Sequence, residues 1–453
     1  MASVATLPPE LLMAIFTLLR PIRPFDSKRT PLQVLSSVSP RWRAIAQATP
    51  ELWADIRLYH VDKKAVQMLT ECIERSNGLP LDISLRGEGI DTSPQSMSVF
   101  LTIVGRVWSP AIVPRWRALS LGVTKTQLSA IRAFGRKSAS GLEFLHLYLV
   151  QDASQADVPS HALFPGRVAV LDFGLLPNLK ELVLEGIGLD VSEASFAERL
   201  VTLSLSGAGT TKICTQMTRY MHQFSAAAAP VPALRNLRLR GTTAGPIPAS
   251  EFASMFLPHV TSLDLSQIVP TDATALISMF YTLRATLKSL TLGEPTIFPL
   301  IDALRRTHPK LRFLNVHTLC LHRLDWNSSD TGRKLFLLFP AVERLILRDL
   351  LFSDASIALA PLVHSDEKDK GKKVVMEQLR VLRLEGSAYG LQELQQFVEQ
   401  RRHLLSNDSP GPAHLTTPHR YELEIAVDEP PVVNLEALRW LRENVRGFRM
   451  VKV

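Results

Sequence analysis

The sequence predicts an α/β protein in which a small helical module precedes an irregular solenoid of strand–helix repeats. Three patterns support this fold class: short helices that begin at prolines, a recurring Leu-x-x-Leu-x-Leu string, and helical spacing between its copies. A strand with its return helix cannot bury its apolar face alone, so such units stack on their neighbours. Right-handed crossovers then place parallel strands on a concave wall and helices outside. We predict a helical module at residues 1–58, the solenoid at 59–433 and a capping helix at 434–453.

Prolines mark where each helix of the N-terminal module begins. The first helix opens at Pro8 and Pro9, and later ones follow at Thr30-Pro31, Ser39-Pro40 and Thr49-Pro50. Proline suits the first position of a helix, and a serine or threonine before it can cap the helix. The module therefore consists of three short helices and a brief fourth turn.

The first helix carries more apolar side chains than a small module can cover. Leu11, Leu12, Ile15, Phe16 and Leu19 recur at steps of three and four, which places them on one face. A domain of this size buries a smaller fraction of its surface than a large one does. We therefore predict that the rest of the chain or another protein covers part of this face.

The order of these residues resembles an F-box. The motifs that carry the likeness are Leu-Pro-Pro-Glu-Leu-Leu at residues 7–12, Ile-Phe at 15–16, Val38, Arg-Trp-Arg at 41–43 and Thr-Pro-Glu-Leu-Trp at 49–53. The version found in fungal F-box proteins with leucine-rich C-terminal regions is the most similar. Two features depart from the pattern without breaking its apolar spacing: a long basic connection, Arg20 to Arg29, and Ser39-Pro40, where many relatives carry a cysteine and a basic residue.

The resemblance implies a partner for this module, the Skp-type adaptor of a cullin ubiquitin ligase. Through that adaptor it implies a cullin, and it implies a target protein held by the repeats. The residues that it assigns to the Skp contact are Leu7, Pro8, Glu10, Leu11, Ile15, Phe16, Leu35, Val38 and Trp42. The residues alone leave open that several of these side chains are ordinary core.

Copies of the Leu-x-x-Leu-x-Leu string recur through the rest of the chain. Clear copies begin at Leu179, Leu200, Leu234, Leu287 and Leu379. Weaker copies run 142–147, 260–265, 311–316 and 342–347, and pairs alone stand at 83/85, 119/121 and 423/425. The spacing between pairs is uneven, and often exceeds the roughly 20 to 29 residues of a leucine-rich repeat. The region therefore resembles an irregular leucine-rich-repeat solenoid that lacks the regular Asn or Cys of the consensus.

Helical patterns fill the intervals between these strands. The expected helices are 61–76, 93–107, 126–136, 211–224, 250–256, 271–284, 298–307, 332–338, 353–363 and 391–404. Prolines such as Pro177, Pro232 and Pro340 precede a strand, where they end the helix and favour extended backbone. Residues 364–373 and 406–418 read as long loops. In the tail, Leu435, Leu438, Leu441 and Val445 are expected to face inward and cap the solenoid.

Composition limits the classes of partner. The chain has 453 residues, a net charge of +8 and 46% hydrophobic residues, and its basic residues are scattered, so we expect no nucleic-acid partner. Three separated cysteines, no basic-then-apolar leader and no apolar run of membrane-spanning length predict a cytoplasmic or nuclear protein without a membrane segment.

Catalytic and metal-binding motifs are weak in this sequence. His317, Cys320 and His322 form a compact group, but a zinc site needs a second pair of ligands nearby. We expect Cys320 to be a small buried side chain instead. No phosphate-binding loop, nucleophile elbow or His-Glu-x-x-His pair occurs, so we expect no cofactor, no metal and no catalysis.

Four arginines are expected at or beside the concave face, near the repeat leucines. Arg235, Arg238, Arg380 and Arg383 would bind an acidic or phosphorylated target through charge-assisted bonds, unless they are merely solvated. We thus predict the substrate-recognition adaptor of a Skp–cullin–F-box ligase. Two alternatives stay open: an interaction scaffold that acts outside a ligase, and an enzyme with an unrecognised site on the repeats.

Overall fold

The computed structural model describes most of the helices and strands of this chain. The described residues are 7–19, 31–86, 94–124, 127, 138–150, 168–170, 176–190, 199–206, 234–240, 259–266, 273–307, 311–323, 329–349, 359–362, 376–386, 391–407, 424–428, 434–445 and 447–451. Contacts divide the chain into two compact units, Met1–Leu234 (unit 1) and Arg235–Val453 (unit 2). The domain boundaries predicted from the sequence stay a prediction.

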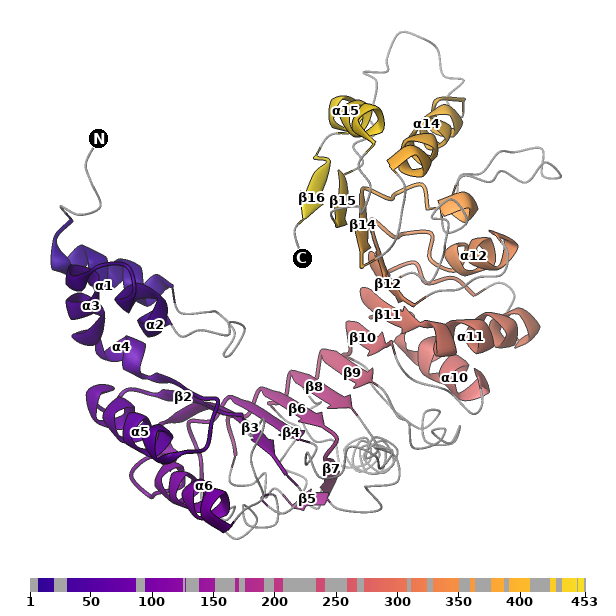
Figure 1. The fold of residues 1–453 in the computed structure, drawn as a ribbon. Coiled ribbons are helices and arrows are strands. Elements are labelled where there is room, and N and C mark those ends of the chain that lie inside the picture. The colour runs from indigo at the N-terminus through magenta and orange to yellow at the C-terminus, as the bar shows by residue number, and fades with distance from the viewer. Residues whose placement is uncertain are drawn as a thin grey trace. The chain divides into compact units, whose positions relative to one another are not determined.

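Unit 1 begins with four short helices that each start at a proline. They are α1 (Pro9–Leu18), α2 (Pro31–Ser36), α3 (Pro40–Gln47) and α4 (Pro50–Trp53) (Figure 1). At the start of α3 the Ser39 hydroxyl accepts a hydrogen bond from the backbone N–H of Trp42. This is the N-cap that satisfies an otherwise unpaired donor of the first turn. The predicted helix starts are therefore confirmed.

A compact apolar cluster holds the four helices together. Helix α3 packs on α1 and α2, and α4 contacts all three of the others. The buried members of the cluster are Leu12, Phe16, Leu35, Ile45, Ala46 and Leu52. The Phe16 and Trp42 rings add a tilted aromatic contact with centroids 4.9 Å apart. Phe16 is thus the centre of a core that uses only one side of α1.

A parallel sheet of strands in the order β1-β2-β3-β4-β6-β8 follows in unit 1. These strands are β1 (Asp55–Leu58), β2 (Leu81–Leu85), β3 (Trp116–Val123), β4 (Phe144–Leu149), β6 (Glu181–Glu185) and β8 (Thr202–Ser206). The helices α5 (Lys63–Arg75) and α6 (Pro94–Val107) lie on one face of it, and a short helix η2 (Val113–Arg115) precedes β3 (Figure 1). A separate parallel pair consists of β5 (Val168–Val170) and β7 (Gly188–Asp190).

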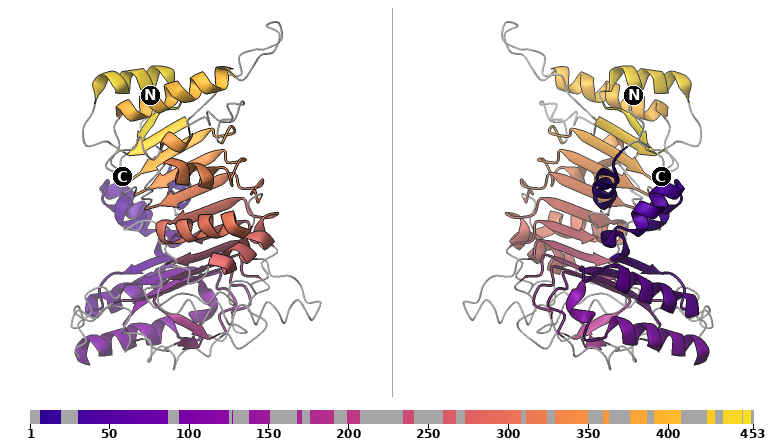
Figure 2. Two further views of the ribbon diagram at one scale, coloured as in Figure 1. Left: turned by 90° about the vertical axis from the view of Figure 1, so that its right-hand side faces the viewer. Right: turned by 90° about the vertical axis from the view of Figure 1, so that its left-hand side faces the viewer.

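Unit 2 repeats the same arrangement with its strands in chain order. They are β9 (Asn236–Arg240), β10 (Ser262–Leu265), β11 (Ser289–Gly293), β12 (Thr318–His322), β13 (Arg344–Arg348), β14 (Val381–Glu385), β15 (Glu424–Asp428) and β16 (Arg449–Val451). Its helices are α10 (Ala273–Leu283), α11 (Glu294–Thr307), α12 (Ser329–Phe336), η7 (Ala360–Leu362), α14 (Leu391–Asn407) and α15 (Leu435–Asn444). The turned views show neighbouring strands of this unit running side by side (Figure 2).

The repeat leucines form continuous rows across each sheet. In unit 1, Leu119 pairs with Leu145, which pairs in turn with Leu182 and then Leu203. In unit 2 the row from Leu237 continues through every strand to Ile425. All of these side chains are buried, because successive residues of a strand face opposite sides and the leucine side is covered. The predicted α/β fold class, a helical module followed by parallel strand–helix repeats, is confirmed.

The register of two predicted strands is wrong. The pair at Leu314 and Val316 was expected to lie on a strand, but the strand is β12 and its buried pair is Leu319 and Leu321. The string Val316-x-x-Leu319-x-Leu321 fits the repeat equally well, and Phe313 instead packs between Phe280 and Phe339 in the preceding turn. Similarly, β15 pairs through Ile425 and Val427 rather than through residues 423 and 425.

The ends of the sheets and several helices also differ from the prediction. Strands β1, β5, β7 and β16 carry no repeat string and were not predicted. The tail helix α15 buries Leu438 and Leu441 as expected but leaves Leu435 exposed, and the chain then adds β16 to the sheet. The expected helices 211–224 and 250–256 lie outside the described residues, as do nearly all of 126–136 and most of 353–363 and the two expected loops.

Candidate functional site

Helix α1 has a second apolar side that the core does not use. Leu12 and Phe16 face the core, whereas Leu11 is 52% exposed and Ile15 is 41% exposed. Leu18 continues the same row at the next turn, because positions i, i+4 and i+7 of a helix share a face. Exposed apolar side chains that line up in this way are typical of a protein–protein contact. We refer to Leu11, Ile15 and Leu18 as the α1 face.

The residues predicted for the Skp contact separate into three groups. Pro8, Glu10, Leu11, Ile15 and Val38 are exposed; Leu7 and Trp42 are half-buried; Phe16 and Leu35 are buried. With 0% and 2% of their surface accessible, Phe16 and Leu35 support the helices from within the core. Helical spacing alone could not separate the two sides of α1, because both sides are apolar.

Two exposed residues of the module were missed by the sequence interpretation as contact candidates. They are Leu18 and Val34, each with a large apolar side chain in solvent. Leu19 is also exposed; it was placed on the apolar face of the first helix but not in the predicted Skp contact. Leu18 follows Leu11 by seven residues and Val34 precedes Val38 by four, so helical spacing contained the signal. The exposed apolar residues of the module therefore extend beyond the set that the resemblance supplied.

Backbone and side-chain bonds fix the orientation of α1 against α3. The Arg41 guanidinium donates to the carbonyl of Leu7, just before α1, and Arg43 Nε donates to the carbonyl of Ser36 at 2.9 Å. Both bonds join a side chain of α3 to the backbone of another element, which lies 34 residues away for Arg41 and seven residues away for Arg43. They hold the start of α1 and the end of α2 against the third helix.

The module joins the first repeat without a linker. Helix α4 leads directly into β1, and Trp53 at the junction is buried. The indole Nε1 of Trp53 donates to the carbonyl of Gln47 at 2.8 Å, and the Arg75 guanidinium of α5 lies 4.5 Å from the indole centroid. A cation over an aromatic face contributes about 0.5–1 kcal/mol at exposed sites. The helical module is thereby packed against the first strand–helix unit.

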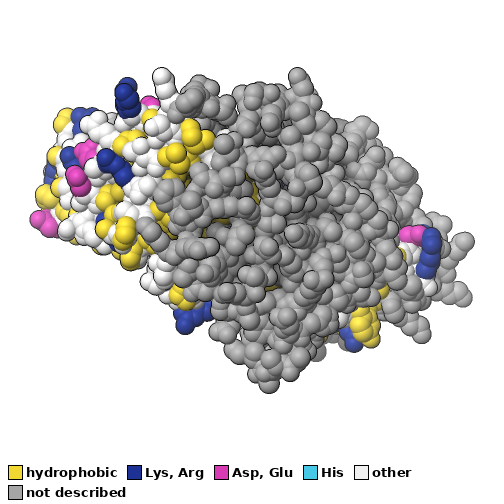
Figure 3. All heavy atoms as spheres, turned by 90° about the horizontal axis from the view of Figure 1, so that it is seen from below, with side chains coloured by type: hydrophobic (Ala, Val, Ile, Leu, Met, Phe, Trp, Pro, Cys, Tyr) yellow, Lys and Arg dark blue, Asp and Glu magenta, His cyan; other side chains and the backbone are white. Residues whose placement is uncertain are grey.

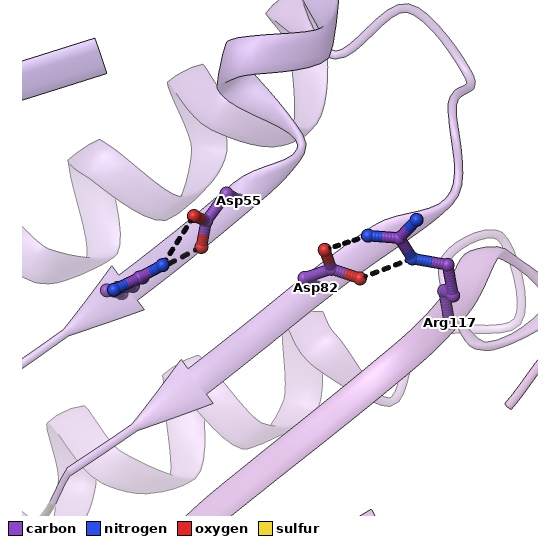
Figure 4. A network of polar contacts seen from close by, with 4 residues as sticks. Asp55, Asp82 and Arg117 are labelled. Carbon is purple, nitrogen blue, oxygen red and sulfur yellow. Dashed lines mark hydrogen bonds and ion pairs between the residues drawn. The ribbon is translucent and has the colours of Figure 1, made fainter. Parts of the chain in front are cut away.

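Charged side chains form pairs on the face of the first strands that lies opposite their apolar rows (Figure 4). Arg57 donates from Nε and Nη2 to the two oxygens of Asp55 at 2.9 and 2.7 Å, and both side chains are almost fully buried. On the next strands, Arg117 forms a similar two-point contact with Asp82. Bidentate pairs of this kind satisfy the polar atoms of both partners, which lowers the cost of burying charge. These residues are structural rather than reactive.

Two of the four arginines predicted for target binding lie on strands of the unit 2 sheet, and the other two lie just before strands. Arg238 and Arg383 share a lateral row that runs through Asp264, Thr291, Cys320 and Ile346. They are five strand steps apart, which is about 24 Å at the usual strand spacing. Arg235 and Arg380 are exposed and lie just before β9 and β14, where their carbonyls accept bonds from the next strand. The structure thus does not gather the four into one cluster.

Acidic side chains pair with Arg383 of this set and with two other arginines of the same sheet, Arg240 and Arg348. Arg383 forms an ion pair with Glu385 at 2.5 Å, and Glu385 also binds Arg348. Arg240 forms an ion pair with Asp264 at 2.8 Å. A paired guanidinium keeps less attraction for a second anion than an unpaired one does. The open face of unit 2 is therefore mixed in charge rather than uniformly basic.

His317 lies just before strand β12, whereas Cys320 and His322 lie on it. Cys320 is buried, and burial raises the pKa of its thiol to about 11, which keeps it protonated at neutral pH. His322 Nε2 lies 2.9 Å from Asp349, and His317 is 3.7 Å from Glu343. Among the described residues, no three His, Cys, Asp or Glu side chains are placed to hold a metal ion.

Other surface features place few limits on partners. On the face seen in Figure 3, basic, acidic and apolar side chains intermix among the described residues. Within the described ranges, no helix has the length and apolarity needed to cross a bilayer.

Comparison with known proteins identifies the N-terminal module. A family model described as F-box-like matches residues 4–59, which span α1 to β1. No curated protein matches the chain. The family match ends just after β1, the first strand of the sheet. Residues 4–59 are an F-box-like domain, a class that generally binds Skp-type adaptors and is typical of non-enzymatic adaptors in ubiquitin ligases.

Proposed function

We propose that this chain is the substrate-recognition adaptor of a Skp–cullin–F-box ubiquitin ligase. Its F-box-like domain docks on the Skp subunit, and its repeats, which we take to be an irregular leucine-rich-repeat solenoid of the fungal type, hold the target. The chain itself performs no chemistry. It raises the concentration of target lysines near the ubiquitin-loaded enzyme, and this proximity is what accelerates transfer.

One observation supports the docking step above all others. The α1 face leaves Leu11, Ile15 and Leu18 in solvent, although a complete core lies directly behind it. Burying an apolar side chain of this size stabilises a complex by about 1.5–3 kcal/mol. A Skp subunit that covered the three residues would remove this exposed surface from water. Pro8, Glu10 and Val38 are exposed and complete the proposed contact, while Phe16 and Leu35 support it from the core.

Co-purification of the full chain with a Skp subunit tests the docking face. We expect the double variant Leu11→Asp, Ile15→Asp to lose Skp binding, because two carboxylates would be buried without partners. Both side chains are exposed in the free chain, so its melting temperature should change little. The matched control is Leu314→Asp, since Leu314 in unit 2 is 64% exposed and equally apolar. Retained binding by the double variant would rule out the α1 face.

The ligase and the scaffold alternatives differ in what Skp carries with it. A ligase adaptor recovers both Skp and cullin, whereas a scaffold recovers Skp without cullin. We expect both subunits, in the cytoplasm or the nucleus, and we expect the bound target to accumulate when the proteasome is inhibited. Recovery of Skp alone under all conditions would favour the scaffold.

A further inference from the structure

A row of aromatic side chains lies on strand β4 of unit 1. Phe144, His146 and Tyr148 alternate with the buried leucines Leu145 and Leu147, so the three rings share the face opposite the leucines. The His146 and Tyr148 ring centroids are 5.0 Å apart, and Phe144 meets His146 edge-on at 6.4 Å. All three are half-buried and keep part of their surface accessible. We call these residues the β4 aromatic row.

The neighbouring strand β3 makes room for this row. Its facing residues are small: Ser120 pairs with His146 and Gly122 pairs with Tyr148. A Cβ at Gly122 would lie 2.4 Å from Cζ of Tyr148, so only glycine lets that ring lie over the backbone. The Ser120 hydroxyl lies 3.2 Å from Nδ1 of His146. The His146 and Tyr148 rings therefore lie close to β3.

Carboxylates flank the row on its other side. On β6, Glu181 is in register with Phe144 and Glu185 is in register with Tyr148. Glu185 is exposed and its Oε1 lies 3.5 Å from His146 Nε2. Each end of the row thus places an aromatic ring beside a carboxylate. The two glutamates stand four residues apart, or about 13 Å along the strand.

Charge at this place differs in sign from the chain as a whole. Around the row the described acids Asp82, Glu143, Glu181 and Glu185 stand against the bases Arg117 and Lys180, and Lys180 pairs with Glu143 at 2.8 Å. Arg117 on β3 is paired with Asp82. The described side chains at this place are therefore acidic on balance, on a protein whose net charge is +8. A cation is attracted both to the face of an aromatic ring and to a carboxylate.

We propose that the β4 aromatic row binds an extended peptide segment of the target that carries two basic side chains four residues apart. One arginine or lysine lies against Phe144 beside Glu181, and the other lies against Tyr148 beside Glu185. An extended chain rises about 3.3 Å per residue, so a four-residue spacing matches the separation of the two glutamates. The inference extends the proposed function, since it names the chemical class of the target.

Fluorescence anisotropy with a labelled Gly-Ser peptide tests the proposal on the full chain. The peptide carries two arginines four residues apart, and a second peptide carries citrulline, which has the same shape without the charge. We expect the citrulline peptide to bind about tenfold more weakly. A third peptide with its arginines two residues apart should also bind more weakly, because it reaches only one glutamate at a time.

Variants of the chain locate the contact. Glu181→Gln and Glu185→Gln keep the shape of the side chain and should each weaken the arginine peptide several-fold. The control Glu377→Gln changes the net charge equally at an exposed position in unit 2 and should change nothing. Tyr148→Leu, checked by thermal melting, should also weaken binding by removing one ring. Three outcomes would overturn the proposal: no saturable binding, equal affinity for citrulline, or equal loss in Glu377→Gln.

The assay contains neither Skp nor cullin, so its outcome is separate from the docking test. Loss of peptide binding with intact Skp recovery would remove the target class and leave the adaptor proposal standing. Peptide binding without Skp recovery would make the β4 aromatic row a recognition site outside a ligase. An acidic peptide that bound more tightly than the arginine peptide would instead point to the arginines of unit 2.

Discussion

The F-box-like domain and the repeats use similar apolar residues in opposite ways. In the repeats, the leucines that pair in rows across the β-strands are buried, from Leu119 to Leu203 in unit 1 and from Leu237 to Leu382 in unit 2. In the domain, α1 buries Leu12 and Phe16 on one side and exposes Leu11 and Ile15 on another. A repeat always has a neighbour that covers it, whereas the module has repeats only at its β1 end. This difference is why we propose that a partner, rather than another repeat, covers the exposed leucines on α1.

The largest expected contrast compares one leucine from each region. Leu290→Ala removes a side chain that is 0% exposed and leaves a cavity between β11 and its covering helices, which should cost about 2–5 kcal/mol of unfolding free energy. Leu11→Ala removes solvent-exposed surface and should change that free energy by less than about 0.5 kcal/mol. Urea denaturation of both variants measures the difference.

The reverse result would break the comparison. If Leu11→Ala cost as much as Leu290→Ala, the α1 face would be packed against the chain's own residues in solution. The slope of the unfolding free energy against urea concentration is compared between the variants as well. A repeat array that no longer unfolds cooperatively shows a lower slope, and its fitted free energies are then not comparable. A control at the exposed Leu314 in unit 2 should resemble Leu11 rather than Leu290.

The sequence predicted those strands and helices whose apolar spacing is compatible with only one register. Repeat strings such as Leu182-x-Leu184 and Leu345-x-Leu347 lie on strands where expected, and prolines located the helix starts of the module. Prediction failed where two phases of the string overlap, as at Leu314 and Leu319, because alternation cannot distinguish them. Tertiary packing of Phe313 between two other aromatic rings decides that register. The residues that make these contacts lie far apart in the sequence, so local periodicity does not reveal them.

The candidate sites were predictable to different degrees. The resemblance supplied three of the large exposed apolar residues of the F-box-like domain, Leu11, Ile15 and Val38, but also two core residues, Phe16 and Leu35. The β4 aromatic row was not recognised, although Phe144, His146 and Tyr148 alternate visibly in the sequence. Alternation shows that the rings share a face, but only the register with β6 reveals that glutamates stand beside them.

A buried and an exposed arginine give a second contrast, this time within unit 2. Arg401 on α14 is 0% exposed and donates to the carbonyl oxygens of Leu362 and Met376. Arg401→Met keeps the length of the side chain but leaves two buried acceptors without this donor, which should cost about 1–3 kcal/mol. Arg439→Met is the control, since Arg439 forms an exposed pair with Glu443 and such pairs contribute little. Equal stability of the two variants would show that water reaches those carbonyls.

The smallest expected effect is a dependence of stability on pH at His322. Burial lowers the pKa of His322 below its usual 6.5, and this outweighs the attraction of Asp349; Arg323 and Arg348 lower it further. Between the lowered pKa and 6.5 the unfolded chain binds a proton that the folded chain does not. The free energy of unfolding therefore falls as the pH drops below 6.5, and this loss levels off below the folded pKa.

Replacing His322 by glutamine isolates that contribution. The variant keeps a polar side chain near Asp349 but cannot titrate, so its stability should fall less between pH 7 and pH 5.5 than that of the unaltered chain. Urea denaturation at the two pH values, with His317→Gln as the exposed control, measures the difference. His317 lies before the same strand and contacts Glu343 at 3.7 Å, so it samples a similar charge without the burial. If both variants lost the same stability between pH 7 and pH 5.5, burial on β12 would not be the cause of the lowered pKa of His322. The difference in burial between His322 and His317 would then have no electrostatic consequence.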